Sequence, residues 1–149
     1  MAQTMAIGLL RQAERRQKSA QTAFEEGDFA YVVRQCLEGV GLALKAVLIH
    51  AGVDFPRWHD VGPILMQEKE SLSFWDEEKL QRFASYSRQL SNDRAKSMYG
   101  DEELLLAPES LFFQHDAREA MGYLAEVLES ATEIILGEAT SPIQEAAEE

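Results

Sequence analysis

Residues 29–51 read FAYVVRQCLEGVGLALKAVLIHA, and this stretch decides the fold. Its apolar residues recur every three or four positions, which is the spacing that places side chains on one face of an α-helix. The recurring positions are Phe29, Val33, Cys36, Val40, Leu44 and Val47, with Leu37 and Leu48 widening the stripe. At 1.5 Å per residue the helix would be about 35 Å long, a length that suits a helical bundle.

Short polar signals mark the ends of this helix. Gly27 can adopt the left-handed conformation that ends a preceding helix, and Asp28 can cap the next one. Gly52 ends the helix on its other side. A sparser apolar pattern over residues 4–26 predicts a helix before Gly27, and the tight connection makes the two helices antiparallel neighbours.

Three further helices are predicted over residues 61–69, 77–99 and 115–136. Asp76 would cap the middle one of these and Gly100 would end it. No stretch sustains the alternation typical of a β-strand. The sequence therefore predicts an all-α fold, an up-and-down antiparallel bundle of four to five helices.

The length of 149 residues suits one domain, which we expect to span residues 1–138, followed by an acidic, disordered tail over residues 139–149. The single cysteine, Cys36, cannot form an internal disulfide and falls on the apolar stripe, where we expect a buried, unreactive thiol. No apolar run is long enough for a membrane span, and residues 1–16 lack the order of a signal peptide. We expect a cytoplasmic protein without a membrane partner.

The net charge of −12 is unevenly distributed. Residues 1–108 carry 13 basic and 16 acidic groups, whereas residues 109–149 carry one basic and ten acidic groups. Proteins that grip nucleic acids neutralise phosphates with Lys and Arg, so the acidic C-terminal part would repel such a polymer. DNA is therefore not expected as a partner, and any RNA-binding surface must lie within the first 108 residues.

Common catalytic and metal-binding motifs are absent from the sequence. There is no glycine-rich phosphate loop, no Cys-x-x-Cys pair and no His-Glu-x-x-His. His50, His59 and His115 are far apart, and the acidic triplet at residues 101–103 is typical of a solvated surface. We predict no metal site and no cofactor.

Lys45 is the first candidate ligand-binding residue, because it lies in the apolar run LALKAVL over residues 42–48. One interpretation is that its stem packs along the apolar surface while its ammonium group complements the helix dipole. The other is that it binds a phosphate or carboxylate group in a groove between helices.

His59 is the second candidate, in the loop sequence RWHD over residues 57–60. It would titrate or hydrogen-bond a base. In the alternative interpretation Asp60 caps the following helix and Trp58 seals the core.

Arg94 and Tyr99 are the third feature, in the segment NDRAKSMYGDE over residues 92–102. An arginine and a tyrosine near the end of a bundle can bind a phosphate and stack on a base. The alternative is a surface ion pair between Arg94 and Asp93, Asp101 or Glu102, which would contribute little energy.

These features, in this order, resemble the HEPN family of helical proteins. The most specific part is the segment GLALKA over residues 41–46, followed by Gly52, Pro56 and the His59-Asp60 pair. Arg94, the YGDE segment at residues 99–102 and the DAREA segment at residues 116–120 extend the likeness, which covers about residues 29–127.

The resemblance implies a helical bundle that pairs as a homodimer and is often encoded beside a small nucleotidyltransferase as toxin and antitoxin. Some HEPN proteins are metal-independent ribonucleases that use an arginine and a histidine separated by four to six residues. Here the corresponding positions after Arg94 are Tyr99, Gly100 and Asp101, so that histidine is missing.

Our leading hypothesis is a non-catalytic HEPN-like domain, with no catalytic residues, that binds a nucleotide or RNA, or partners a nucleotidyltransferase. Arg94 would contact phosphate, Tyr99 would stack on a base or carry a modified hydroxyl, and Lys45 would add positive charge. One alternative is a metal-independent ribonuclease in which His59 replaces the missing histidine. The other is a purely structural bundle whose acidic last helix docks onto a basic partner.

Overall fold

The computed structural model describes residues 1–55 and 60–137. These residues form α1 (Ala2–Glu25), α2 (Phe29–His50), α3 (Gly62–Gln67), α4 (Glu77–Asn92), α5 (Arg94–Tyr99) and α6 (Gln114–Ile135). A single 3₁₀ turn, η1 (Pro108–Ser110), precedes α6. The predicted all-α fold is confirmed. The predicted tail at residues 139–149 lies outside the described residues.

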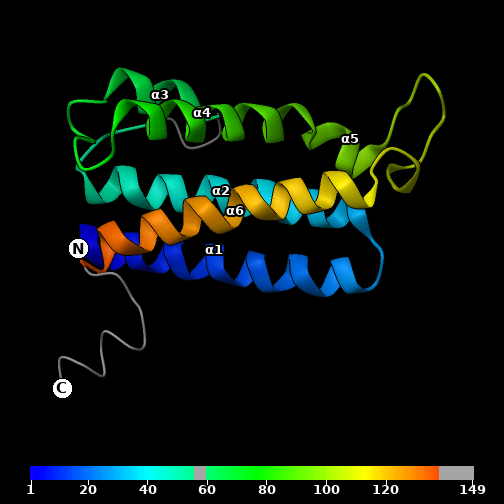
Figure 1. The fold of residues 1–149 in the computed structure, drawn as a ribbon, viewed down its shortest axis with the longest axis horizontal. Helices are drawn as coiled ribbons and strands as arrows, with labels where there is room; N and C mark the ends of the chain where they lie inside the picture. Colours follow the sequence, from blue (N-terminus) through cyan, green and yellow to red (C-terminus); the bar gives the residue numbers. More distant parts are fainter. Residues whose placement is uncertain (56–59, 138–149) are drawn as a thin grey trace.

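Helix α2 occupies the centre of the molecule (Figure 1). It packs against α1 on one side and α4 on the other, while α6 lies across α1 and α2. The successive long helices α1, α2, α4 and α6 run in alternating directions along the long axis, as the up-and-down antiparallel prediction requires. The side-chain amide of Gln3 donates a 2.8 Å hydrogen bond to the carbonyl of Ile135 and so joins the start of α1 to the end of α6.

The predicted helix boundaries rest on local hydrogen bonds. Gly27 has a φ of 78°, in the left-handed region, and the Asp28 carboxylate accepts a 3.3 Å hydrogen bond from the backbone N–H of Tyr31. The Asp76 carboxylate likewise accepts a 2.7 Å hydrogen bond from the N–H of Lys79 at the start of α4. Both predicted caps are confirmed, because each satisfies a donor that has no partner within its helix.

The core lies along the apolar stripe of α2, and small residues bring its neighbours close. A Cβ atom added to Gly39 would lie 2.8 Å from a Leu124 methyl carbon on α6, so this glycine permits the close approach of α2 and α6. Cys36 is fully buried, as predicted, and burial raises the pKa of its thiol to about 12. The thiol therefore stays protonated at physiological pH.

The helix predicted over residues 77–99 is interrupted. Helix α4 ends at Asn92 and α5 begins at Arg94, because the Asp93 N–H bonds to the Leu90 carbonyl, three residues earlier, in a tighter turn than an α-helix has. The interruption changes the direction of α5 relative to α4, and with it the direction of the Arg94 side chain. The helix predicted over residues 61–69 is also shorter, Gly62–Gln67.

Along the described residues no helix is both long and apolar enough to cross a bilayer.

Candidate functional site

A groove opens on α2 between two helices that do not meet. In the described part of the chain α1 and α4 each pack against α2 but make no contact with each other. The hollow between them has a volume of about 560 Å³, within the range of small-molecule sites. We call it the α2 groove.

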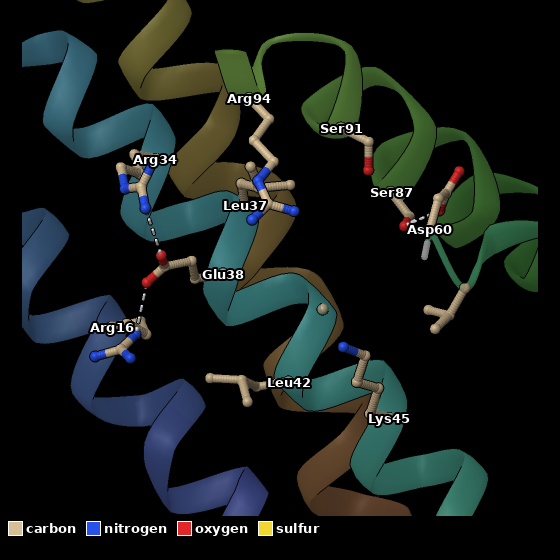
Figure 2. A pocket seen from close by; sticks show the side chains of 12 residues that line it. Arg16, Arg34, Leu37, Glu38, Leu42, Lys45, Asp60, Ser87, Ser91 and Arg94 are labelled. Atoms are coloured by element: carbon tan, nitrogen blue, oxygen red, sulfur yellow. Dashed lines mark hydrogen bonds and ion pairs between the residues drawn. The ribbon is translucent and has the colours of Figure 1, made fainter. Parts of the chain in front are cut away.

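The floor of the α2 groove is one face of α2, and its walls come from four other segments (Figure 2). The floor residues are spaced by three and four positions, as on a single helical face: Arg34, Leu37, Glu38, Gly41, Leu42 and Lys45. The walls are Arg16 from α1, Ser87 and Ser91 from α4, Arg94 from α5, and Asp60 and Val61 before α3. Segments distant in sequence thus meet at this groove.

Positive charge prevails among the described lining residues. Arg16, Arg34, Lys45 and Arg94 are cationic, whereas only Glu38 and Asp60 are acidic, which gives a local balance of +2. The whole chain has a net charge of −12. A cleft lined by one sign of charge concentrates ligands of the other sign, so the groove favours an anion on an otherwise acidic protein.

At one end of the groove, a single carboxylate forms ion pairs with two guanidinium groups. Glu38 lies 3.0 Å from Arg16 Nε and 3.3 Å from Arg34 Nη2. The Arg16 N–H does not point at that oxygen, and both Arg16 Nε and Arg34 Nη1 are buried without a hydrogen-bond partner among the described residues. A buried donor without a partner costs free energy, but neither nitrogen is exposed to a ligand in the groove.

Lys45 and Arg94 approach the groove from opposite sides. Figure 2 shows both side chains directed into the same hollow, Lys45 from α2 and Arg94 from α5. Burial and, secondly, the positive charge of Arg94 lower the pKa of the Lys45 ammonium group. Two cations therefore repel each other here, and an anion between them would relieve that repulsion.

The Arg94 guanidinium has no ion pair or hydrogen bond to any residue that the structure describes. The predicted alternative, a surface ion pair with Asp93, Asp101 or Glu102, is therefore wrong. None of the five donors of the guanidinium is taken by a residue that the structure describes, and the group lies at the rim of the groove.

Asp60 closes the groove on the α4 side. Its Oδ1 atom accepts a 2.9 Å hydrogen bond from the N–H of Gly62, the first residue of α3, and a short one from the Ser87 hydroxyl. Asp60 thus accepts a hydrogen bond from the start of α3, as predicted, although the N-cap position itself is Val61, one residue later. The same carboxylate fastens the chain before α3 to α4.

The structure brings together two of the four residues predicted from sequence. Lys45 and Arg94 line the groove, whereas Tyr99 lies at the end of α5 with 66% of its surface exposed and does not line it. His59 lies outside the described residues, as does Trp58. The other two histidines are elsewhere: His50 Nδ1 lies 3.1 Å from the Gln3 side-chain oxygen, and His115 pairs with Glu119 at 3.5 Å.

Sequence reasoning missed the remaining groove residues. Arg34, Glu38 and Gly41 precede Lys45 at spacings of four, three and four, so the helical periodicity of α2 already places them on its face. Arg16 and Ser87 carry no such signal, because their helices reach the groove only through tertiary packing.

Among the described residues, no three His, Cys, Asp or Glu side chains lie close enough together to hold a metal ion.

Comparison with known proteins gives one match. The HEPN domain family matches residues 7–135, which is most of the chain. Neither the curated proteins nor the solved structures contain a significant match.

Proposed function

Since the chain belongs to the HEPN domain family, we propose that it binds a phosphate-bearing nucleotide in the α2 groove without cleaving RNA. Membership supports a nucleotide-related or ribonuclease-type function at the level of the family. The observation that carries the proposal is the excess of cations around Lys45 and Arg94 on a chain of net charge −12.

Each cation has a distinct part in holding the phosphate. Arg94 presents a planar guanidinium group, which forms paired, charge-assisted hydrogen bonds to phosphate oxygens. Arg34 pairs with Glu38 through Nη2 and has a buried Nη1, so it contributes positive charge at one end of the groove. Lys45 adds a point charge from the floor of the groove. On the opposite side the Ser91 hydroxyl and the Asp60 carboxylate are suited to the hydroxyl groups of a ribose.

The described groups that line the groove support binding rather than cleavage. General acid–base cleavage of RNA needs a group that exchanges a proton near neutral pH, most often a histidine. The positions where ribonucleases of the family carry this histidine are Tyr99, Gly100 and Asp101 here. His50 and His115 do not line the groove.

Nucleotide titration tests this function directly. Calorimetry with the four ribonucleoside triphosphates and the four monophosphates should reveal binding by the wild-type protein that Arg94→Ala weakens. Arg88→Ala is the matched control, since Arg88 is an exposed arginine on α4 that does not line the groove. If no nucleotide binds, or if both variants bind as the wild type does, the proposal is wrong.

The ribonuclease alternative depends on His59 and has its own test. Long RNA incubated with the protein in EDTA should remain intact. Cleavage that disappears in both His59→Ala and Arg94→Ala would establish a ribonuclease instead.

A surface at the end of the bundle after α5 supports a second proposal, that of a partner protein. Tyr99, Leu104, Leu105 and Phe113 are exposed by 66%, 67%, 89% and 66%, an unusual concentration of apolar surface. A homodimer, or a nucleotidyltransferase in a toxin–antitoxin pair, would cover such a surface. The nucleotidyltransferase would also have access to the Tyr99 hydroxyl for modification.

Sedimentation of the purified protein tests the dimer. A tagged pull-down followed by intact-mass analysis of Tyr99 and Tyr99→Phe tests the partner.

A further inference from the structure

Helix α2 contains two glycines two positions apart, and only one has a packing role. A Cβ atom at Gly39 would lie 2.8 Å from a Leu124 methyl carbon, so the Leu124 side chain would have to shift if Gly39 had a side chain. A Cβ atom at Gly41 would meet none of the described residues within 4 Å. Gly41 is half-buried and lies on the floor of the α2 groove.

The fold itself has no need of a glycine at position 41. A glycine in the middle of a helix is less favourable than alanine, because it loses more backbone freedom on folding. Helix α2 runs without interruption from Phe29 to His50, so Gly41 marks neither a kink nor an end. Within the described part of the chain, its missing side chain leaves open space above the helix backbone.

That open space lies between the cations of the groove. Lys45 follows Gly41 by four residues and Arg34 precedes it by seven, so all three share one face of α2. Arg94 reaches the same hollow from α5. A ligand held between these charges lies directly over Gly41, where any larger residue would project into it.

We propose that Gly41 is the point where the ligand rests against α2, and that the ligand is a mononucleotide whose phosphate lies between Lys45 and Arg94. This inference rests on the proposed function. From Arg34 to Lys45 the floor extends about 16 Å along the helix, at 1.5 Å per residue, which suits one nucleotide rather than a strand. A longer polymer would leave the groove and meet a protein surface of net negative charge.

The test compares Gly41→Ala with Gly122→Ala. Gly122 lies in the middle of α6, is exposed, does not line the α2 groove, and would also carry a Cβ in open space. Both variants should fold with an unchanged or higher Tm, as expected for alanine in a helix. Calorimetry with the nucleotide that the wild type binds best should show at least a tenfold loss of affinity in Gly41→Ala, a larger loss in Gly41→Val, and none in Gly122→Ala.

The outcomes separate this inference from the function on which it rests. Wild-type affinity in both Gly41 variants would overturn the role of Gly41 and leave nucleotide binding intact. Tighter binding of a ten-residue oligoribonucleotide than of any mononucleotide would overturn the ligand class. Failure of the wild-type protein to bind any nucleotide would overturn the proposed function itself, and this inference with it.

Discussion

The α2 groove and the contact between α4 and α6 use the same kinds of side chain in opposite ways. On the α4–α6 contact, Arg82 donates a 2.6 Å hydrogen bond from Nε to Glu126 and lies 3.1 Å from Glu78. The Tyr86 hydroxyl also donates to Glu126, at 2.8 Å. In the groove, Arg94 has neither kind of partner within the described residues.

The pKa shifts follow this difference. Burial alone would raise the pKa of Glu126, but hydrogen bonds from Tyr86 and Arg82 outweigh it and the net shift is downward. The carboxylate is thus stabilised by groups of its own protein. For Lys45, burial and the charge of Arg94 both act against the charged form and lower the pKa. Charges paired within the protein hold α4 and α6 together, whereas the excess of positive charge described in the groove favours binding of an anion.

The largest expected effect is the loss of nucleotide binding in Arg94→Ala. Because Arg94 makes no described side-chain contact, its removal should leave the Tm within a degree or two. Nucleotide affinity should fall at least tenfold, which is about 1.4 kcal/mol of binding free energy. Calorimetry and thermal unfolding measure the two quantities, and a large drop in Tm with unchanged affinity would contradict the comparison.

Arg82→Ala should produce the reverse pattern. It leaves the partly buried Glu126 without its arginine, and since Arg82 is about a third exposed we expect a loss of only about 1 kcal/mol in the free energy of unfolding. Nucleotide affinity should not change. The pKa of Glu126 is lowered in the folded state, so its contribution is present above the ordinary glutamate pKa and is lost as the pH falls through the folded value.

Urea unfolding of wild type and Arg82→Ala at several pH values checks this assignment. The difference between them should shrink in acid, because Glu126 then loses the charge that attracts Arg82. A difference that stays constant down to pH 3 would show that Arg82 acts through packing alone.

A smaller effect is expected from the titration of Lys45. Since a phosphate binds the protonated ammonium group, ATP affinity should fall about threefold to tenfold as the pH rises through the lowered pKa, starting below the ordinary lysine range. Stability should change in the opposite direction. The unfolded chain binds more protons between the two pKa values, so the free energy of unfolding rises with pH there.

Lys45→Arg is the control for this titration, because arginine keeps its charge across the whole range. Its ATP affinity should be flat with pH where that of the wild type falls. An equal decline in both proteins would assign the titration to another group.

The smallest effect should come from Glu38→Gln, which removes one of the two described carboxylates of the groove. The local balance rises from +2 to +3, and an additional screened charge of this kind is worth about 0.5 kcal/mol, or roughly a twofold gain in nucleotide affinity. The gain should vanish at high salt. A loss of affinity would instead show that Glu38 is needed to position Arg16 and Arg34.

The sequence by itself determined the features that depend on near neighbours. The period of α2, the left-handed Gly27 and the caps at Asp28 and Asp76 each involve residues within a few positions of one another, and all were predicted correctly. The same locality made Lys45 recognisable as an unusual cation in an apolar run. The break at Asp93 escaped prediction, because it is a tightened turn that needs neither glycine nor proline, and residues 91–94 contain neither.

Only the tertiary structure determined which charged side chains lie close together in the groove. Arg16, Lys45 and Arg94 come from three different helices, and their encounter depends on α1 and α4 packing on α2 without touching each other. That arrangement depends in turn on contacts such as Gly39 against Leu124, between residues far apart in the chain. The spacing of apolar residues along a helix determines the face on which each side chain lies. Which other segment packs against that face depends on contacts between residues far apart in the chain.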